Sequence, residues 1–109
     1  MDMKTSPLST LNDPSLLKTD ALIGGEWVAG DARFDVTDPA TGLKLADVAN
    51  LGAEAAETAI AAANRAWPAW RNKTAKERAA ILMKWFNLLH ANADDLARIM
   101  TAEQGKPLA

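Results

Sequence analysis

The sequence predicts an α/β protein in which a small β-meander precedes three helices. Short apolar runs separated by glycine and proline turns occupy residues 21–49, as in antiparallel strands joined by tight turns. From residue 53 onward the apolar positions recur at helical spacing. Alanine supplies 23 of the 109 residues, so only 30 large apolar side chains are left to form a core. Because the four strands have no obvious covering layer, we expect an incomplete domain.

The N-terminal segment, residues 1–12, is expected to be flexible. It begins with a polar run, and chain termini are often poorly ordered. Asp13 and Pro14 then predict a short helical turn. Aspartate is a preferred N-cap, and proline fits the first helical position because no partner for its missing N–H is needed there.

The strands are delimited by two turns. Gly24 and Gly25 predict a tight hairpin, because both can adopt positive φ without a Cβ clash. The segment 38–42, Asp-Pro-Ala-Thr-Gly, predicts a second turn in which proline fixes φ and glycine leaves the turn. The expected strands are residues 21–23, 26–28, 34–37 and 43–49.

Three helices are expected over about residues 53–104. A proline lacks the backbone donor that a helix interior needs, so Pro68 should end the first helix. The second helix should open with a capping box over Thr74–Glu77. In this motif the Thr74 hydroxyl accepts from the Glu77 N–H, and the Glu77 carboxylate accepts from the Thr74 N–H. Asn92 is the expected N-cap of the third helix, and Gly105 its C-cap.

Composition excludes several classes of protein. The net charge of −2 gives no electrostatic footprint for nucleic acid. No apolar run is long enough to span a bilayer, and the first twenty residues lack the apolar stretch of a signal peptide. We therefore expect a cytoplasmic protein. The sequence contains no cysteine, so it offers neither disulfides nor a thiolate nucleophile.

The residues that could carry chemistry have simpler explanations. His90 is the only histidine and has no partners for a catalytic constellation, so a surface or helix-end position is expected. Asp94 and Asp95 are adjacent and cannot face each other on a helix, so they are assigned to the helix dipole. Gly105-Lys106 is followed by proline rather than serine or threonine, which argues against a phosphate loop.

Three of the four tryptophans could line an aromatic ligand site. At helical spacing among leucines, Trp67, Trp70 and Trp85 are better explained as core anchors, and Trp27 as a cap over the first hairpin. The six glycines form no G-x-G-x-x-G turn, so no dinucleotide-binding turn is visible either.

Five motifs occur in an order that resembles the beginning of an aldehyde dehydrogenase. Further motifs resemble the branch of that family that oxidises succinate semialdehyde, and related branches, such as those acting on glutarate semialdehyde, stay open. The five motifs are Leu22–Val28, Asp38–Gly42, Ala66–Arg71, Thr74–Ala79 and Glu103–Ala109; those of the branch are Asp13–Leu17, Lys84–Leu89 and Asp94–Thr101.

The resemblance implies what the full-length protein does. Members of the family oxidise an aldehyde to a carboxylate with NAD or NADP, and a cysteine thiolate adds to the carbonyl before hydride leaves. The nucleophile, the glutamate that activates water, the stabilising asparagine and the cofactor loop all lie beyond the matching region. We therefore assign no catalytic, cofactor-binding or metal-binding residue in this chain.

Residues 1–109 are thus expected to be the N-terminal part of an aldehyde dehydrogenase domain. The expected role is scaffolding around the cofactor-binding domain, and the chain alone should bind no cofactor, be inactive and be marginally folded. The full-length enzyme should act on a small aldehyde as a homo-oligomer, without nucleic-acid or membrane partners. Some members hold a structural monovalent cation, which here would lie around Val36 and Glu103. The alternative is a self-standing interaction module that uses the tryptophan-bearing helix face.

Overall fold

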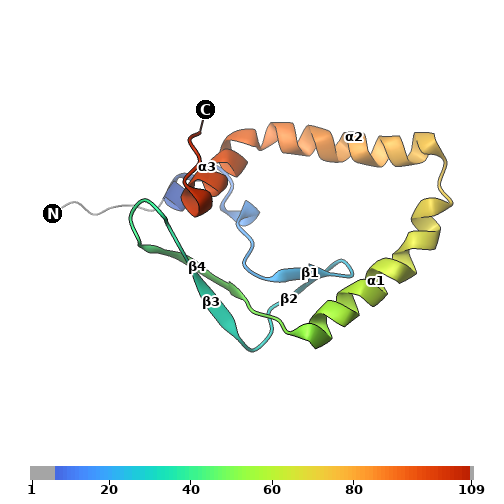
Figure 1. Ribbon diagram of the computed structural model, residues 1–109. Helices are drawn as coiled ribbons and strands as arrows, with labels where there is room; N and C mark the ends of the chain where they lie inside the picture. Colours follow the sequence, from blue (N-terminus) through green and yellow to red (C-terminus); the bar gives the residue numbers. More distant parts are fainter. Residues whose placement is uncertain (1–6, 109) are drawn as a thin grey trace.

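The computed structural model describes residues 7–108, and the elements follow one another around an open ring (Figure 1). Two short 3-10 helices lead into four antiparallel strands and then three α-helices, which confirms the predicted order. The Cα radius of gyration is 17.3 Å, whereas a compact domain of this length has about 13 Å. The chain is therefore more extended than a closed domain.

The segment before the strands is attached to the rest of the protein. It contains η1 (Pro7–Thr10) and η2 (Pro14–Leu16), and η1 packs on the last helix. Asp13 caps η2 as predicted, because its Oδ1 accepts from the Ser15 N–H at 3.1 Å. Residues 7–12 thus contain η1 and its contact with the last helix, and the flexibility expected for residues 1–12 stays a prediction. Residues 1–6, which that prediction also covers, lie outside the described residues.

The four strands form two separate hairpins instead of one meander. β1 (Ala21–Ile23) pairs with β2 (Glu26–Val28), and β3 (Arg33–Thr37) pairs with β4 (Lys44–Ala49), all antiparallel. No ladder joins β2 to β3 within the described residues. The reason lies in residues 29–32, where the chain turns sharply at a glycine with positive φ before β3 begins.

Both predicted turns are confirmed. Gly24 and Gly25 have φ of 60° and 83°, values that a residue with a Cβ rarely adopts. In the β3–β4 turn the Asp38 carbonyl accepts from the Gly42 N–H at 2.7 Å, and its Oδ1 accepts from the Ala40 N–H at 2.8 Å. These bonds satisfy an aspartate that is only 6% exposed.

The first α-helix continues beyond the residue that was expected to stop it. α1 (Ala53–Arg71) contains Pro68 in its last turn. Proline removes one backbone donor, but its carbonyl remains available and accepts from the Asn72 N–H at 3.0 Å. One bonded turn therefore follows the proline before the helix ends, and the predicted end at Pro68 is wrong.

The other two helices begin and end largely as predicted. α2 (Ala75–Ala91) opens with the complete capping box, and α3 (Ala93–Gln104) ends at Gly105 in the left-handed conformation. Asn92 is the exception. Its side chain donates to the Leu88 carbonyl at 2.8 Å and so closes α2, and it makes no capping bond to α3.

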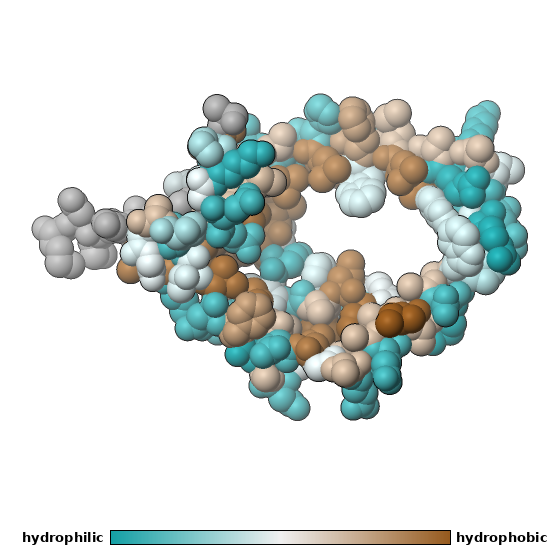
Figure 2. Space-filling view, in the orientation of Figure 1, coloured by the Kyte–Doolittle hydropathy of each residue, from teal (hydrophilic) through white to brown (hydrophobic). Residues whose placement is uncertain are grey.

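The described residues bury very little apolar surface. Leu11, at 8% exposed, and Ala102, at 1%, are the only apolar side chains classed as buried in residues 8–108. Trp67 and Trp85 are 52% and 61% exposed, so the expectation that they are core anchors is wrong for this chain, whereas Trp70 is half-buried. Figure 2 shows apolar residues bordering a wide opening, so these residues have no packing partner within it.

Candidate functional site

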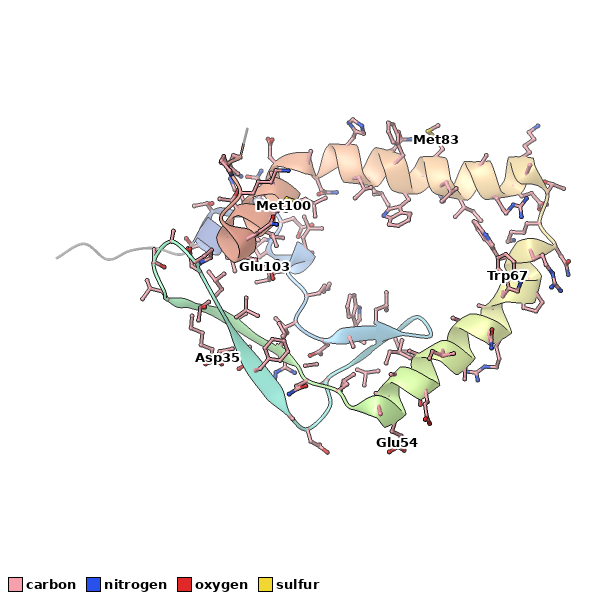
Figure 3. All side chains as sticks on the ribbon, in the orientation of Figure 1. Asp35, Glu54, Trp67, Met83, Met100 and Glu103 are labelled. Carbon is pink, nitrogen blue, oxygen red and sulfur yellow. The ribbon has the colours of Figure 1, made fainter. Side chains whose placement is uncertain are left out.

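An apolar surface on α2 is a candidate binding feature. We call it the α2 apolar surface, and its seven residues are 45% to 61% exposed. Figure 3 shows Met83 on the side of α2 that faces away from the opening, so the apolar residues reach more than one side of the helix. A helix that is apolar over much of its circumference is normally buried. The residues are Ile81, Leu82, Met83, Trp85, Phe86, Leu88 and Leu89.

Charge is unevenly distributed around the ring. Residues 58–93, which include most of α1 and all of α2, contain six basic residues and one acidic residue. Residues 7–57, which contain all the strands, hold nine acidic and three basic residues. The small net charge therefore conceals a basic helical half and an acidic strand half. The cations on the helices are Arg65, Arg71, Lys73, Lys76, Arg78 and Lys84.

Asp95 in the first turn of α3 makes the most specific long-range contact in the described chain. Its Oδ1 and Oδ2 accept from the backbone N–H groups of Asn12 and Asp13, both at 2.9 Å. The Arg98 Nη1 lies 3.6 Å from Oδ1, and the Asp95 side chain is 4% exposed. The N–H of Asn12, with that of Asp13 and the Arg98 charge, holds the Asp95 pKa below its ordinary value.

Helix-dipole complementation, the role predicted for both acids, describes Asp94 but is incomplete for Asp95. Asp94 is exposed, whereas Asp95 is buried and joins α3 to the N-terminal segment. Sequence reasoning missed this contact, because the partners lie 82 and 83 residues away and are backbone groups. Backbone donors leave no side-chain signal to find.

Arg33 joins the two hairpins. Its Nε donates to Asp47 Oδ1 at 2.7 Å within the β3–β4 hairpin, and its Nη1 donates to Asp20 Oδ1 at 3.0 Å beside β1. The hydrogen bond with Asp47 raises the pKa of Arg33 and lowers the pKa of Asp47. Lys44 adds ion pairs to Asp35 at 3.4 Å and to Asp47 at 3.6 Å. These contacts are structural and leave no free group aimed at a ligand.

Among the remaining candidate residues, His90 and Glu103 are exposed and Val36 is half-buried. His90 is exposed in the last turn of α2, with its ring centroid 4.4 Å from that of Phe86. For the cation expected near Val36 and Glu103, Val36 is half-buried in β3 and Glu103 is exposed in α3. Within residues 7–108, no group of three or more histidine, aspartate or glutamate side chains is arranged to hold a metal.

The α-helix N-termini of this chain differ from those that bind the phosphates of a nicotinamide cofactor. Helix N-termini are the usual sites for such phosphates, because their free N–H groups and dipole attract anions. Here every α-helix has an acid in its first turn: Glu54 in α1, Glu77 in α2, and Asp94 with Asp95 in α3. These carboxylates repel a phosphate, so we derive no chemical step through a cofactor.

The order of elements and the motifs on them define the class of this protein. Residues 27–109 match the aldehyde dehydrogenase family, and the chain belongs to that family. It is 59% identical over 101 residues to the NADP-dependent succinate-semialdehyde dehydrogenase GabD of Escherichia coli. The match covers 91% of this chain and 21% of that enzyme. This chain therefore comprises a part of the family's fold.

Other relatives carry names of similar enzymes. A 3-sulfolactaldehyde dehydrogenase of Pseudomonas putida is 55% identical over 91% of this chain, and covers the same 21% share. The crystal structure of a succinate-semialdehyde dehydrogenase from Burkholderia pseudomallei superposes with a TM-score of 0.88 at 59% identity, over 91% of this chain and 21% of that one. The open ring is thus a conformation that the same segment adopts inside a much larger structure. In residues 7–108 no helix is both long and apolar enough to cross a membrane.

Proposed function

We propose that this chain is the scaffold portion of an NAD(P)-dependent dehydrogenase that oxidises succinate semialdehyde or a related aldehyde bearing an acid group. The observation that supports this proposal most directly is that the chain is 59% identical to such an enzyme but covers only 21% of that enzyme's length. The relatives named for 3-sulfolactaldehyde and glutarate semialdehyde extend the substrate class to other acid-bearing aldehydes. The choice between NAD and NADP belongs to residues outside this segment.

The scaffold role follows from what the chain exposes and what it lacks. Oxidation by the family's route needs a thiolate to attack the carbonyl, and this sequence contains no cysteine. The α2 apolar surface has no covering partner in the described residues. We infer that this surface packs against the cofactor-binding and catalytic parts of the enzyme and holds them in place without touching substrate.

The test measures aldehyde-dependent formation of the reduced nicotinamide by absorbance. The purified 109-residue chain with succinate semialdehyde and either NAD or NADP should give no signal. Mixed with the E. coli relative from which the matching 101 residues have been deleted, it should restore turnover. Turnover by the chain alone contradicts the scaffold role. A silent mixture, under conditions in which the intact relative is active, contradicts the packing role.

A pair of variants localises the contact. Trp85→Glu places a charge in the α2 apolar surface and should abolish complementation, because a buried unpaired carboxylate is strongly unfavourable. Lys84→Glu introduces the same side chain at the neighbouring, exposed position and should leave complementation largely intact. Equal loss in both variants would show that charge, and not apolar burial, governs the association.

The remaining parts of the proposal concern the whole enzyme. We place it in the cytoplasm as a homo-oligomer, acting on a small molecule without nucleic-acid or membrane partners. The bacterial relatives support the location by analogy, and the human relative named as mitochondrial shows that members differ. Cell fractionation and sedimentation of the full-length protein test these two statements.

The second candidate is a self-standing interaction module, and the exposure of the α2 apolar surface favours it. Such a surface on a monomer commonly marks an interface. The two proposals predict different gene products. Coding sequence that continues past the Ala109 codon into the remaining family motifs supports the scaffold, whereas a stop codon there together with a stable cellular protein of 11.6 kDa supports the module.

A further inference from the structure

The two ends of the described chain meet at one place, where the N-terminal segment contacts α3 and so completes the ring. We call residues 7–13 the strap, and the contact between the strap and α3 the clasp. η1 packs against α3 there. The two buried apolar residues of the described chain lie on either side of it, Leu11 in the strap and Ala102 in α3. Among residues 8–108, the other buried residues are Asp95, in the clasp itself, and Asp38, in the β3–β4 turn.

The clasp is held by a fully satisfied buried carboxylate. Both oxygens of Asp95 are occupied by the N–H groups of Asn12 and Asp13, and Arg98 lies beside Oδ1. Withdrawal of the strap would leave the carboxylate without these two donors and the two N–H groups without an acceptor. A buried polar network is stable when all of its hydrogen bonds form, and breaking only some of them is unfavourable in free energy. The strap is therefore expected in two discrete states, docked on α3 or released from it.

The helical arm of the ring depends on this contact. α2 has few contacts with the hairpins and is held at its two ends, by α1 and by α3. α3 is fixed on one side by the clasp and on the other by Gly105, where an added Cβ would lie 3.3 Å from Pro39 Cγ in the β3–β4 turn. Gly105 therefore lies beside the β3–β4 turn, which is a second point at which α3 meets the hairpins.

We propose that the clasp is a conformational device of this chain: a detachable strap, pinned by Asp95, whose release lets α2 and α3 swing away from the hairpins as intact helices. This inference does not depend on the proposed enzyme. Opening the clasp widens the ring and gives access to the inner side of α2. Docking the strap fixes α2 at one distance from the hairpins.

Pairs of spin labels measure that distance directly, and the absence of cysteine makes specific labelling simple. Cysteines replace Glu26 in β2 and Lys84 in α2, both exposed positions. The unaltered clasp should give one narrow distance distribution. Asp95→Asn should broaden it toward longer distances, because an amide cannot accept from two backbone donors with both of its polar atoms. Asp94→Asn, which removes the same charge from the adjacent exposed residue, should leave it narrow.

A second variant acts from the other side of the contact. Leu11→Ser removes the strap's buried apolar side chain and lies outside all three α-helices, so it should give the same broad distribution as Asp95→Asn. Hydrogen exchange at the Asn12 and Asp13 amides should accelerate about tenfold in Asp95→Asn, as loss of a buried hydrogen-bond partner predicts. Far-UV circular dichroism should show unchanged helix content in both variants.

Three results would overturn the proposal. A narrow distribution in both Asp95→Asn and Leu11→Ser would show that the clasp does not hold the arm. A broad distribution in the chain with an intact clasp would show that the strap does not close the ring. Loss of helix content in both variants, with Asp94→Asn unaffected, would show that the contact maintains the fold and is not a hinge between intact elements.

Discussion

Adjacent residues of the same type have different environments in this protein, and Asp94 and Asp95 are the clearest case. Both lie in the first turn of α3, yet one is exposed and the other binds two backbone N–H groups. Residue type and spacing predicted that neither acid pairs with the other, and the structure agrees. They could not predict the partners of Asp95, because these are backbone groups 82 and 83 positions earlier.

The ion pair between Arg33 and Asp47 makes stability depend on pH. The hydrogen bond from Arg33 lowers the folded-state pKa of Asp47, so the stabilisation is present above the unfolded value of about 3.9. It is lost as pH falls through the lower folded-state pKa. A titration of the Asp47 carboxyl by NMR should therefore have its midpoint below the ordinary range.

Arg33→Lys provides the comparison for that titration. A lysine cannot bond both Asp47 and Asp20 with the same planar geometry, so the Asp47 midpoint should rise toward its ordinary value. Because Lys44 also faces Asp47, Lys44→Gln should raise the midpoint by less. An equal rise in the two variants would mean that general charge, and not the Arg33 hydrogen bond, sets the shift.

Glycine at position 30 is required for two reasons, whereas Gly25 is required for one. Both have positive φ, at 69° and 83°, which costs other residues about 1 kcal/mol. A Cβ on Gly30 would also overlap the Leu51 side chain, while nothing lies within 4 Å of a Cβ on Gly25. Gly30→Ala should thus destabilise more than Gly25→Ala, by about 1–3 kcal/mol of overpacking.

Denaturant unfolding measures that difference, and Leu51 supplies its control. In a double-mutant cycle, Leu51→Ala should remove the additional cost of Gly30→Ala and leave the cost of Gly25→Ala unchanged. If the two alanine variants are equally destabilised, the Leu51 side chain relaxes and only the backbone strain remains.

At the scale of elements, predictions succeeded where the determining interaction is local in sequence. The Thr74–Glu77 capping box, the Gly24-Gly25 hairpin and the Gly105 cap all involve groups a few residues apart, and all three are confirmed. The predictions of the end of α1 and of the role of Asn92 were wrong, although the interactions that decide them are local too. In both cases a carbonyl accepted a bond that the simple rule leaves out.

The capping box determines how well α2 begins. The Thr74 hydroxyl accepts from the Glu77 N–H at 3.1 Å, and Glu77 Oε1 accepts from the Thr74 N–H at 2.9 Å. Thr74→Ala should lower stability by about 1 kcal/mol, because the first turn loses an acceptor. Thr74→Ser keeps the acceptor and should stay close to the unaltered chain. Thermal unfolding, followed by circular dichroism at a helix wavelength, measures the stability of both variants. An equal loss of stability in Thr74→Ala and Thr74→Ser would contradict a capping role.

At the scale of the whole molecule, composition predicted a thin core, and only Leu11 and Ala102 are buried apolar residues among those described. The expected β-meander became two hairpins, because the pairing of β2 with β3 is a choice between competing strand partners that no motif encodes. The resemblance to the start of a longer enzyme predicted an exposed helix face at Trp85 and Phe86, and these residues are 61% and 51% exposed. Exposure depends on whether another layer is present, and periodicity reports only which side chains would need one.

The open ring should be visible in solution scattering. A chain in this conformation has a Cα radius of gyration of 17.3 Å, whereas collapse of α2 onto the hairpins would bring it toward about 13 Å. We expect small-angle X-ray scattering at low protein concentration to give the larger value. The smaller value would show that the opening in Figure 2 closes when nothing else fills it.

The clasp also constrains when this chain can finish folding. Translation produces the strap before its acceptor Asp95, which follows 82 and 83 residues after the two donors. Closing so long a loop is slower than forming the local hairpins and helices that lie between. The strap therefore docks after the hairpins and helices that follow it, and it stays unattached while the segments that separate it from α3 fold.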